Sequence, residues 1–368
     1  MRSATIPAFV VTGFLGSGKT TLLQRLLQDP GFADTAVIVN EFGTVGLDHE
    51  LLAFASERIV VLPGGCLCCS VREDMEATLS ELFNGVASGQ VPRFSRLVIE
   101  TTGLAEPGPL LFTLTASPVA VGRLHVEAVV TVVDALLARM SEATHGEWEK
   151  QVAVADRLVI SKGDLVPRAD VARLRARLRA INPWADIRTM NLLTAEPKGL
   201  FRRARRLATA GHSLGRPATS SSAHRSHSQD GPTLQAVSLA YDVPLDWTAF
   251  GVWLTLLLHR HGERIPRIKG LLNVSGLPGP VAIHAVQHIV HPPQHFDSWP
   301  SADRRSRLVF IAHGIGAYEI ERSLGAFNSA ARQEAPASES ETYRPAGAGG
   351  TIAGRPVRRN TAPRWMKG

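Results

Sequence analysis

Eight residues near the N-terminus have the types and spacing of a loop that binds phosphate. They satisfy the pattern GxxxxGK[ST] directly after the apolar run Ile6–Thr12, and they read Gly13-Phe14-Leu15-Gly16-Ser17-Gly18-Lys19-Thr20. Glycines allow successive backbone N–H groups to point at phosphate oxygens, and the helix that follows adds partial positive charge. In this pattern the lysine contacts the β- and γ-phosphates and the final hydroxyl ligates Mg²⁺. The sequence therefore predicts a nucleoside triphosphate site with Mg²⁺ that includes Gly13, Gly16, Ser17, Gly18, Lys19 and Thr20.

A second motif bears on which base is bound. The run Ser161-Lys162-Gly163-Asp164 stands at the end of the apolar segment Leu158–Ser161. The carboxylate of Asp164 can accept hydrogen bonds from N1–H and the 2-amino group of guanine, which adenine does not offer, and the stem of Lys162 can pack on the flat base. A Lys-Gly-Asp turn without any ligand is the alternative. The position of the motif after a predicted strand favours guanine.

Three carboxylates and one glycine are candidates for sensing the γ-phosphate. Glu41 and Asp48 follow one apolar run, and Glu100 ends another, three residues before Gly103. Acidic groups at strand ends can hold Mg²⁺ or its waters, and a following glycine can offer its N–H to the γ-phosphate. Ordinary loop polarity is the alternative. The candidate catalytic residues are Lys19, Glu41, Asp48 and Glu100.

The three cysteines are clustered at Cys66, Cys68 and Cys69, after two glycines. An odd, clustered set cannot form a disulfide framework, so we expect a metal site. Thiolates bind Zn²⁺ tetrahedrally, and sulfurs this close together leave a position open or filled from elsewhere, which suits a site that passes metal on. Soft thiolates also permit cobalt. A redox dithiol formed by Cys66 and Cys69 is the alternative.

Histidines supply a further hint of metal binding. Four of them fall in one stretch of the C-terminal half, at His284, His288, His291 and His295. They are candidate auxiliary metal ligands, and structural or solvated histidines are the alternative.

The elements that must position these residues follow from hydrophobic periodicity. Continuous apolar runs alternate with segments of helical period, at Ile6–Thr12, Ala36–Asn40, Ile59–Leu62, Arg96–Glu100, Ala128–Val133 and Leu158–Ser161. Runs of this kind indicate parallel strands covered on both faces. Ligands of such sheets bind at the carboxyl ends of the strands, where the phosphate loop and the cysteine cluster would share an edge. The prediction for residues 1–210 is an α/β P-loop NTPase domain with a mostly parallel sheet flanked by helices.

The rest of the chain divides into three parts. Residues 211–232 are rich in Ser, His, Gly and Pro and are predicted to be a flexible linker. Residues 233–328 are predicted to be a small α+β domain with antiparallel pairing, and residues 329–368 a disordered basic tail. The expected elements are strands at Leu234–Leu239, Gly270–Val274, Val281–Val290 and Arg307–Ala312 and a helix at Trp247–Arg260.

Composition excludes several classes of protein. The 368 residues contain no apolar run of the roughly 18 residues that a membrane span needs. The N-terminal residues lack the pattern of a secretory signal, so a cytoplasmic location is expected. The net charge of +7 comes partly from Arg168–Arg179, where Leu174, Leu178 and Ile181 have helical spacing. We interpret this segment as a solvated helix face, and expect neither a nucleic acid nor a membrane as partner.

Six ordered motifs together resemble the CobW family of P-loop GTPases, the metallochaperone relatives of the urease and hydrogenase maturation GTPases. They are GFLGSGKTT, NEFG, GGCLCC, ETTGLAEP, VVDA and SKGDL. The stretch from Arg267 to Pro300 resembles the C-terminal domain of that family, and the resemblance covers about residues 6–325. It implies hydrolysis of GTP to GDP and phosphate, which drives the transfer of zinc, or of cobalt in some members, from the CxCC cysteines to a client metalloprotein.

The resemblance also implies roles for particular residues. Thr21 joins the phosphate site, Glu41 and Asp48 belong to switch I, and Glu100–Gly103 forms the Walker B and switch II segment. Asn182-Pro183 resembles a family segment near the base. The chain departs from the family pattern at Ser161, where an Asn is usual, and at two positions where some relatives carry Glu, Val39 and Thr44.

Three hypotheses follow for the function. The first is a GTP-dependent zinc chaperone, monomeric or homodimeric, in which nucleotide and metal binding are coupled. The second is a GTP-driven cobalt insertion factor. The third is a passive metal store or sensor in which the nucleotide only stabilises the fold.

Overall fold

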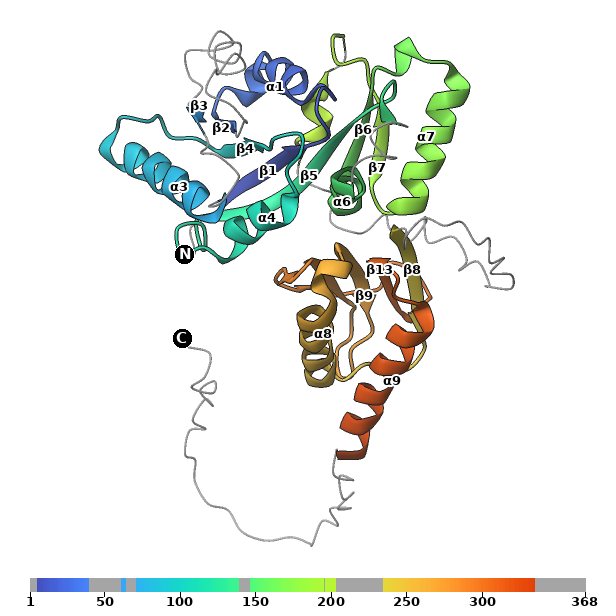
Figure 1. The fold of residues 1–368 in the computed structure, drawn as a ribbon. Helices are drawn as coiled ribbons and strands as arrows, with labels where there is room; N and C mark the ends of the chain where they lie inside the picture. The colour runs from blue at the N-terminus through green and yellow to red at the C-terminus, as the bar shows by residue number, and fades with distance from the viewer. Residues whose placement is uncertain are drawn as a thin grey trace, which may run out of the picture.

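The computed structural model describes residues 5–39, 61–63, 71–138, 146–194, 196–202 and 234–334. Several predictions lie outside these residues: the roles of Glu41 and Asp48, the cysteine cluster, the linker 211–232 and the tail from residue 335 onward. The described residues form two domains, each with its own sheet (Figure 1).

The N-terminal domain is built on a seven-stranded parallel sheet with the strand order β3-β2-β4-β1-β5-β6-β7. The predicted α/β class is therefore confirmed. The strands are β1 (Ile6–Thr12), β2 (Thr35–Val39), β3 (Val61–Pro63), β4 (Arg96–Glu100), β5 (Leu124–Asp134), β6 (Arg157–Ser161) and β7 (Asp186–Thr189). The longer helices are α1 (Lys19–Leu27), α3 (Val71–Ser88), α4 (Pro107–Ala116), α6 (Gly146–Val154) and α7 (Arg168–Ile181). Short 3-10 turns are η1 (Pro30–Phe32), η2 (Gly163–Leu165) and η3 (Pro197–Leu200).

Alternate residues of each strand enter cores on opposite faces of this sheet, which explains the continuous apolar runs. In β1, Ala8 and Val10 pack in a core with α3 and α4, whereas Phe9 and Val11 pack in another with α1 and η3. Helices α6 and α7 supply a third core over β6. Fully burying one large aliphatic or aromatic side chain of this kind contributes about 1.5–3 kcal/mol.

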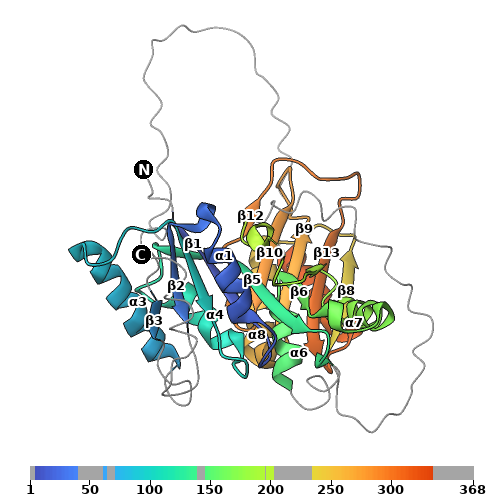
Figure 2. The same ribbon diagram turned by 90° about the horizontal axis from the view of Figure 1, so that it is seen from above.

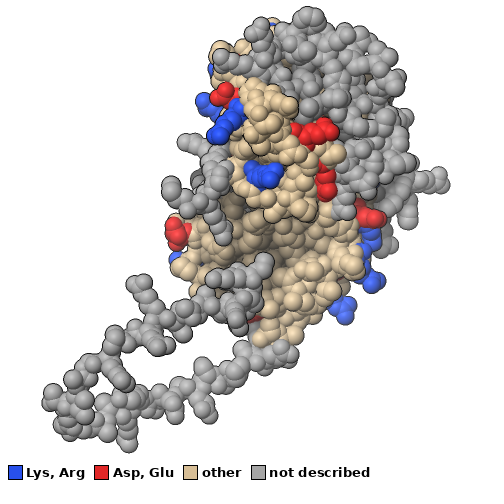
Figure 3. All heavy atoms as spheres, turned by 90° about the vertical axis from the view of Figure 1, so that its left-hand side faces the viewer, with Lys and Arg blue, Asp and Glu red and all other residues tan. Residues whose placement is uncertain are grey.

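The arginines of α7 fit the predicted solvated helix face. Arg173 pairs with Asp170 one turn earlier, and Arg177 lies 3.3 Å from Glu149. Arg175 donates to the carbonyl of Ile187 at 2.8 Å. Figure 3 shows the left-hand side of the molecule in Figure 1, away from α7, where the Lys and Arg side chains of the described surface lie in small groups among uncharged residues. None of the described helices is long and apolar enough to cross a membrane.

The C-terminal domain is an antiparallel sheet of order β11-β10-β9-β13-β8, with β12 paired to β10. Its elements are β8 (Leu234–Tyr241), α8 (Trp247–His261), η4 (Gly262–Arg264), β9 (Arg267–Leu272), β10 (Val281–Val286), β11 (Ile289–Val290), β12 (Gln294–His295), β13 (Ser306–His313) and α9 (Ala317–Glu334). The predicted strand Val281–Val290 is split by a turn at Gln287, which has a φ of 49°. Helix α9 continues to Glu334, beyond residue 328, after which the tail was predicted to begin.

Helices α8 and α9 cover one face of this sheet, and the N-terminal domain lies on the side of the sheet away from them (Figures 1 and 2). Val286 and Ile289 join the core of α4, while Leu234 and Ile311 join the core of α6 and α7. The two domains therefore share apolar cores.

Candidate functional site: the nucleotide edge of the parallel sheet

The loop between β1 and α1 depends on glycine conformations. Gly13, Gly16 and Gly18 have φ angles of 142°, 68° and 99°, which side chains with a Cβ rarely adopt. At Gly13 a Cβ would also lie 2.2 Å from the carbonyl oxygen of Val132, so the loop passes directly over β5. The motif glycines thus fold the chain into the tight loop that the sequence predicts.

Lys19 is the first residue of α1, and its side chain turns back into this loop. Its Nζ donates to the carbonyl oxygens of Gly13 at 2.8 Å and Phe14 at 3.2 Å. The side chain is buried, although it carries a charge. The ammonium group and the N-terminus of α1 therefore supply positive charge at the same place.

Thr20, the second residue of α1, meets Glu100, the last residue of β4. The Thr20 hydroxyl donates to Glu100 Oε1 at 3.0 Å, and β4 is aligned with β1 through the pairing of Val11 with Glu100. Glu100 is only 5% exposed, so this carboxylate is directed into the site rather than into solvent. A hydroxyl and a carboxylate are oxygen ligands of the kind that Mg²⁺ prefers. The residues present therefore fit a magnesium ion.

The segment after β4 lies directly on the phosphate loop. A Cβ at Gly103 would be 2.5 Å from the backbone nitrogen of Leu15. The carbonyls of Gly103 and Ala105 accept hydrogen bonds from Nε2 of Gln151 in α6, at 3.0 and 3.1 Å. Sequence analysis missed Gln151, because a glutamine within a helix has no distinctive pattern.

The predicted base motif contacts the phosphate loop through two of its side chains. The hydroxyl of Ser161 donates to the carbonyl of Ser17 at 2.7 Å, and Nζ of Lys162 donates to the carbonyl of Gly16 at 2.8 Å. Lys162 Nζ also lies 2.6 Å from Asp134 Oδ2, so the lysine ties the loop to the end of β5. We expected only its stem to pack on a base; its ammonium also holds the site together.

Asp164 lies at the exposed rim of the same edge. Its Oδ2 accepts a hydrogen bond from Nδ2 of Asn191 at 3.3 Å. Asn191 follows β7, and the next residue, Leu192, approaches Gly18 in the phosphate loop. Asp164 therefore stands beside the loop with its carboxylate accessible.

Two family models match most of the chain. Residues 7–189 match the model described as "CobW/HypB/UreG, nucleotide-binding domain", and residues 234–328 match "Cobalamin synthesis protein cobW C-terminal domain". The chain belongs to the CobW/HypB/UreG family. The resemblance stated from the six motifs is thereby confirmed.

Members of this family align with the chain along most of its length. The zinc chaperone YjiA of Escherichia coli is 31% identical over 322 residues, which cover 87% of this chain and 98% of that protein. The zinc chaperone CobW of Pseudomonas aeruginosa is 31% identical over 357 residues, covering 87% and 91%. The crystal structure of Zn(II)-bound YjiA GTPase shares the fold with a TM-score of 0.63 at 24% identity, over 88% of this chain and 99% of that one. The chain is therefore a P-loop GTPase, and its relatives support a metallochaperone GTPase.

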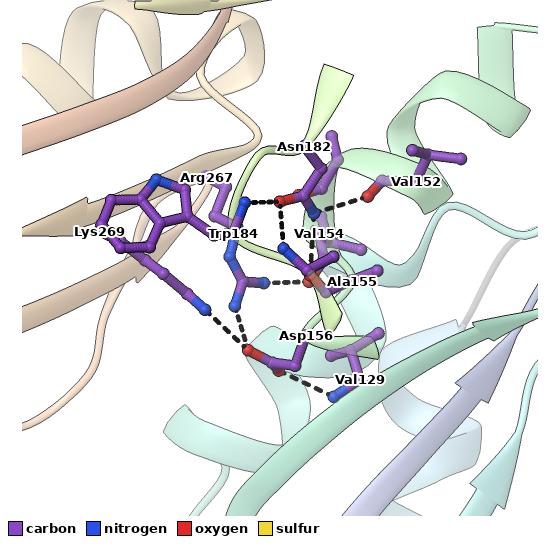
Figure 4. A network of polar contacts seen from close by, with 11 residues as sticks. Val129, Val152, Val154, Ala155, Asp156, Asn182, Trp184, Arg267 and Lys269 are labelled. Carbon is purple, nitrogen blue, oxygen red and sulfur yellow. Dashed lines mark hydrogen bonds and ion pairs between the residues drawn. The ribbon is translucent and has the colours of Figure 1, made fainter. Parts of the chain in front are cut away.

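One segment expected near the base lies at the opposite edge of the sheet. Asn182 follows α7 and is fully buried, and its Nδ2 donates to the carbonyls of Val152, Ala153 and Ala155 at 2.9–3.0 Å (Figure 4). It therefore satisfies carbonyls at the C-terminal end of α6, before β6 begins. The expectation that Asn182-Pro183 lies near the base is wrong, because the chain reaches this point before β7 returns to the nucleotide edge.

The C-terminal histidines do not form a metal centre with one another. Burial, Lys269 and Arg267 lower the pKa of His284 to about 3, and burial also lowers the pKa of His291. Within the part of the chain that the structure describes, no three or more His, Cys, Asp or Glu side chains are grouped as a metal site. A metal centre built from three or more of these histidines is therefore not found among the described residues.

Proposed function

We propose that the chain is a GTP-hydrolysing chaperone that binds zinc at Cys66, Cys68 and Cys69 and transfers it to a client metalloprotein. The names of two relatives, both zinc chaperones, support the metal. The clustered thiolates supply the donor set, and zinc is the cargo rather than a resident cofactor.

The observation on which the proposal rests most is the position of β3. Its last residue, Pro63, pairs with Val39 of β2, and Val39 pairs with Glu100 of β4. Neighbouring strands are about 4.8 Å apart, so Pro63 is roughly 10 Å from the strand end that bears Glu100. Cys66 is three residues beyond Pro63 in the sequence, a span of at most about 11 Å. Connectivity thus keeps the thiols within reach of loops that contact the nucleotide.

The described geometry supports some of the nucleotide roles, and the family resemblance supplies the others. Lys19 and the N–H groups of the glycine loop bind the phosphates, while Thr20 and Glu100 would hold Mg²⁺, which would supply positive charge beside the phosphates. The Gly103 N–H contacts the γ-phosphate, and Asp164 recognises guanine. The resemblance assigns Glu41 and Asp48, which lie outside the described residues, to switch I, and Thr21 to the phosphate site.

Coupling between nucleotide and metal is tested by measuring zinc affinity with a competing chelator. GDP and a non-hydrolysable GTP analogue should give values that differ about a hundredfold, which corresponds to about 2.7 kcal/mol of coupling. Lys19→Ala should abolish the difference, whereas Lys198→Ala, a change in an exposed lysine, should leave it intact. Replacement of all three cysteines by Ser should abolish tight zinc binding in both states. Equal zinc affinity in the two nucleotide states of the wild type would refute the coupling.

A further inference from the structure

Gln151 links a fully buried helix position to the loop that lies on the phosphate site. Its side chain is 0% exposed. The amide nitrogen donates twice, to the carbonyls of Gly103 and Ala105. The same loop begins at Glu100 and passes within van der Waals contact of Leu15 at Gly103. Gln151 therefore fixes the backbone of a loop whose position decides where the Gly103 N–H points.

The orientation of the amide is determined by its partners. Both loop groups are carbonyl acceptors, so the NH₂ group must face the loop. The backbone of Gln151 is held as well, because its carbonyl accepts from the hydroxyl of Thr131 in β5 at 2.8 Å. The side-chain oxygen, Oε1, has no hydrogen-bond partner among the described residues. A buried acceptor without a partner destabilises the folded state. An apolar side chain at position 151 would leave no acceptor unpaired.

The preceding residue makes a second tie to the same loop. Lys150 forms an ion pair with Glu106, which immediately precedes α4. Both side chains of this pair are about one-third exposed, so solvent screens it. The buried bonds from Gln151 are therefore the better-defined restraint on the loop.

We propose that Gln151 is a positioning residue for GTP hydrolysis. It does not touch the nucleotide; it holds Gly103–Ala105 so that the Gly103 N–H is aimed at the γ-phosphate before the reaction. Preorganised donors lower the barrier because they need not reorient as charge develops. This inference rests on the nucleotide site proposed above.

Two variants change the hydrogen bonds from position 151 to the loop in different ways. Gln151→Leu removes both donations and should lower kcat about ten- to hundredfold, the loss expected from two neutral hydrogen bonds. GDP affinity should stay within about twofold, because GDP lacks the γ-phosphate. Gln151→Glu keeps the shape but presents a carboxylate to two carbonyls. When protonated, it can donate one hydrogen bond again. Its kcat relative to wild type should therefore rise as the pH falls from about 8 to 5.5.

Asn182→Ala is the matched control, since Asn182 donates to three carbonyls at the end of the same helix without contacting the loop. It should lower the melting temperature and leave kcat within about twofold. A Gln151→Leu enzyme with wild-type kcat, or one whose losses match those of Asn182→Ala, would overturn the proposal. If Gln151→Leu does not fold, the test is the kcat of Gln151→Glu divided by that of the wild type. A ratio that does not change with pH overturns the proposal. Absence of GTP binding by the wild type would instead refute the proposed nucleotide site.

Discussion

Removing the carboxylate of Asp156 should weaken the attachment of the C-terminal domain. Asp156 precedes β6, and its Oδ1 is bound by Arg267 and lies 3.2 Å from Nζ of Lys269, both on β9 (Figure 4). Its Oδ2 accepts from the backbone N–H of Val129 at 3.0 Å. Arg267 also donates to the carbonyl of Val154. One carboxylate thus balances two cations from the other domain.

The pKa values of Asp156 and Lys269 show how the carboxylate and its cations affect one another. Burial alone would raise the pKa of Asp156, but Arg267, Lys269 and the Val129 N–H together hold the pKa below its ordinary value. Burial and Arg267 lower the pKa of Lys269 to about 8, although Asp156 acts to raise it. In Asp156→Asn, Lys269 can lose its proton at neutral pH, whereas Arg267 stays charged and 5% exposed. Because the Asp156 side chain is 28% exposed, we expect a loss of about 3 kcal/mol, the lower end of the range for a buried pair that loses one partner.

This loss is measured by urea unfolding, monitored through the hydrogen exchange of residues 150–157 and 264–272. With a slope of about 3 kcal/mol per molar urea, the midpoint for these segments should fall by about 1 M. Arg267→Met should cost a similar amount, and the double variant should cost at least about 1.5 kcal/mol less than the sum. Asp186→Asn, which breaks a half-exposed pair with Arg188, should cost at most about 1 kcal/mol. Additive losses, or Asp156→Asn within about 0.5 kcal/mol of wild type, would refute the reasoning.

Two further outcomes follow from the structure. In the proposed guanine site, Asp164 would accept a hydrogen bond from the 2-amino group of the base. Asp164→Asn should therefore lower GTP affinity at least about tenfold and favour xanthosine triphosphate, because the Asn amide can donate to the 2-carbonyl of xanthine. Competition binding with both nucleotides checks this. The folded-state pKa of His284, about 3, lies below the ordinary 6.5, so the unfolded chain binds more protons between these values and stability is lost as the pH falls from 6.5 toward 3. His284→Asn should make the melting temperature less dependent on pH in that window, and an unchanged dependence would count against this role.

Local patterns were sufficient where a single segment determines its own structure. The bounds of β4 match the predicted run Arg96–Glu100, because all but one of its residues are buried and both faces are covered. Strand β7 was not predicted: only Ile187 of its four residues is buried, so no apolar run marks this edge strand. Helix α9 continues to Glu334, so a change of composition did not locate the end of this helix.

Long-range contacts account for the rest of what the sequence did not predict. Asp156 and Arg267 are 111 residues apart, and Gln151 is 48 residues from Gly103. Neither pair belongs to a motif with fixed spacing. Only the packing of α6 against the sheet and of the second domain against α6 brings them together. The contacts of Lys19 with Gly13 and Phe14, by comparison, join residues only six and five positions apart, and these lie within the motif that the sequence shows.

Helix α6 connects these two sets of contacts. Gln151 binds the loop over the phosphate site, and Val154, three residues later in the sequence, accepts from Arg267 of the other domain. Three residues of helix span only about 4.5 Å. A displacement of Gly103 must therefore either break the bonds from Gln151 or move α6, and α6 cannot move without disturbing Arg267. At the other end of the same loop, Gly108, the second residue of α4, lies against the side chain of Gln287. The C-terminal domain thus contacts both helices that hold the loop.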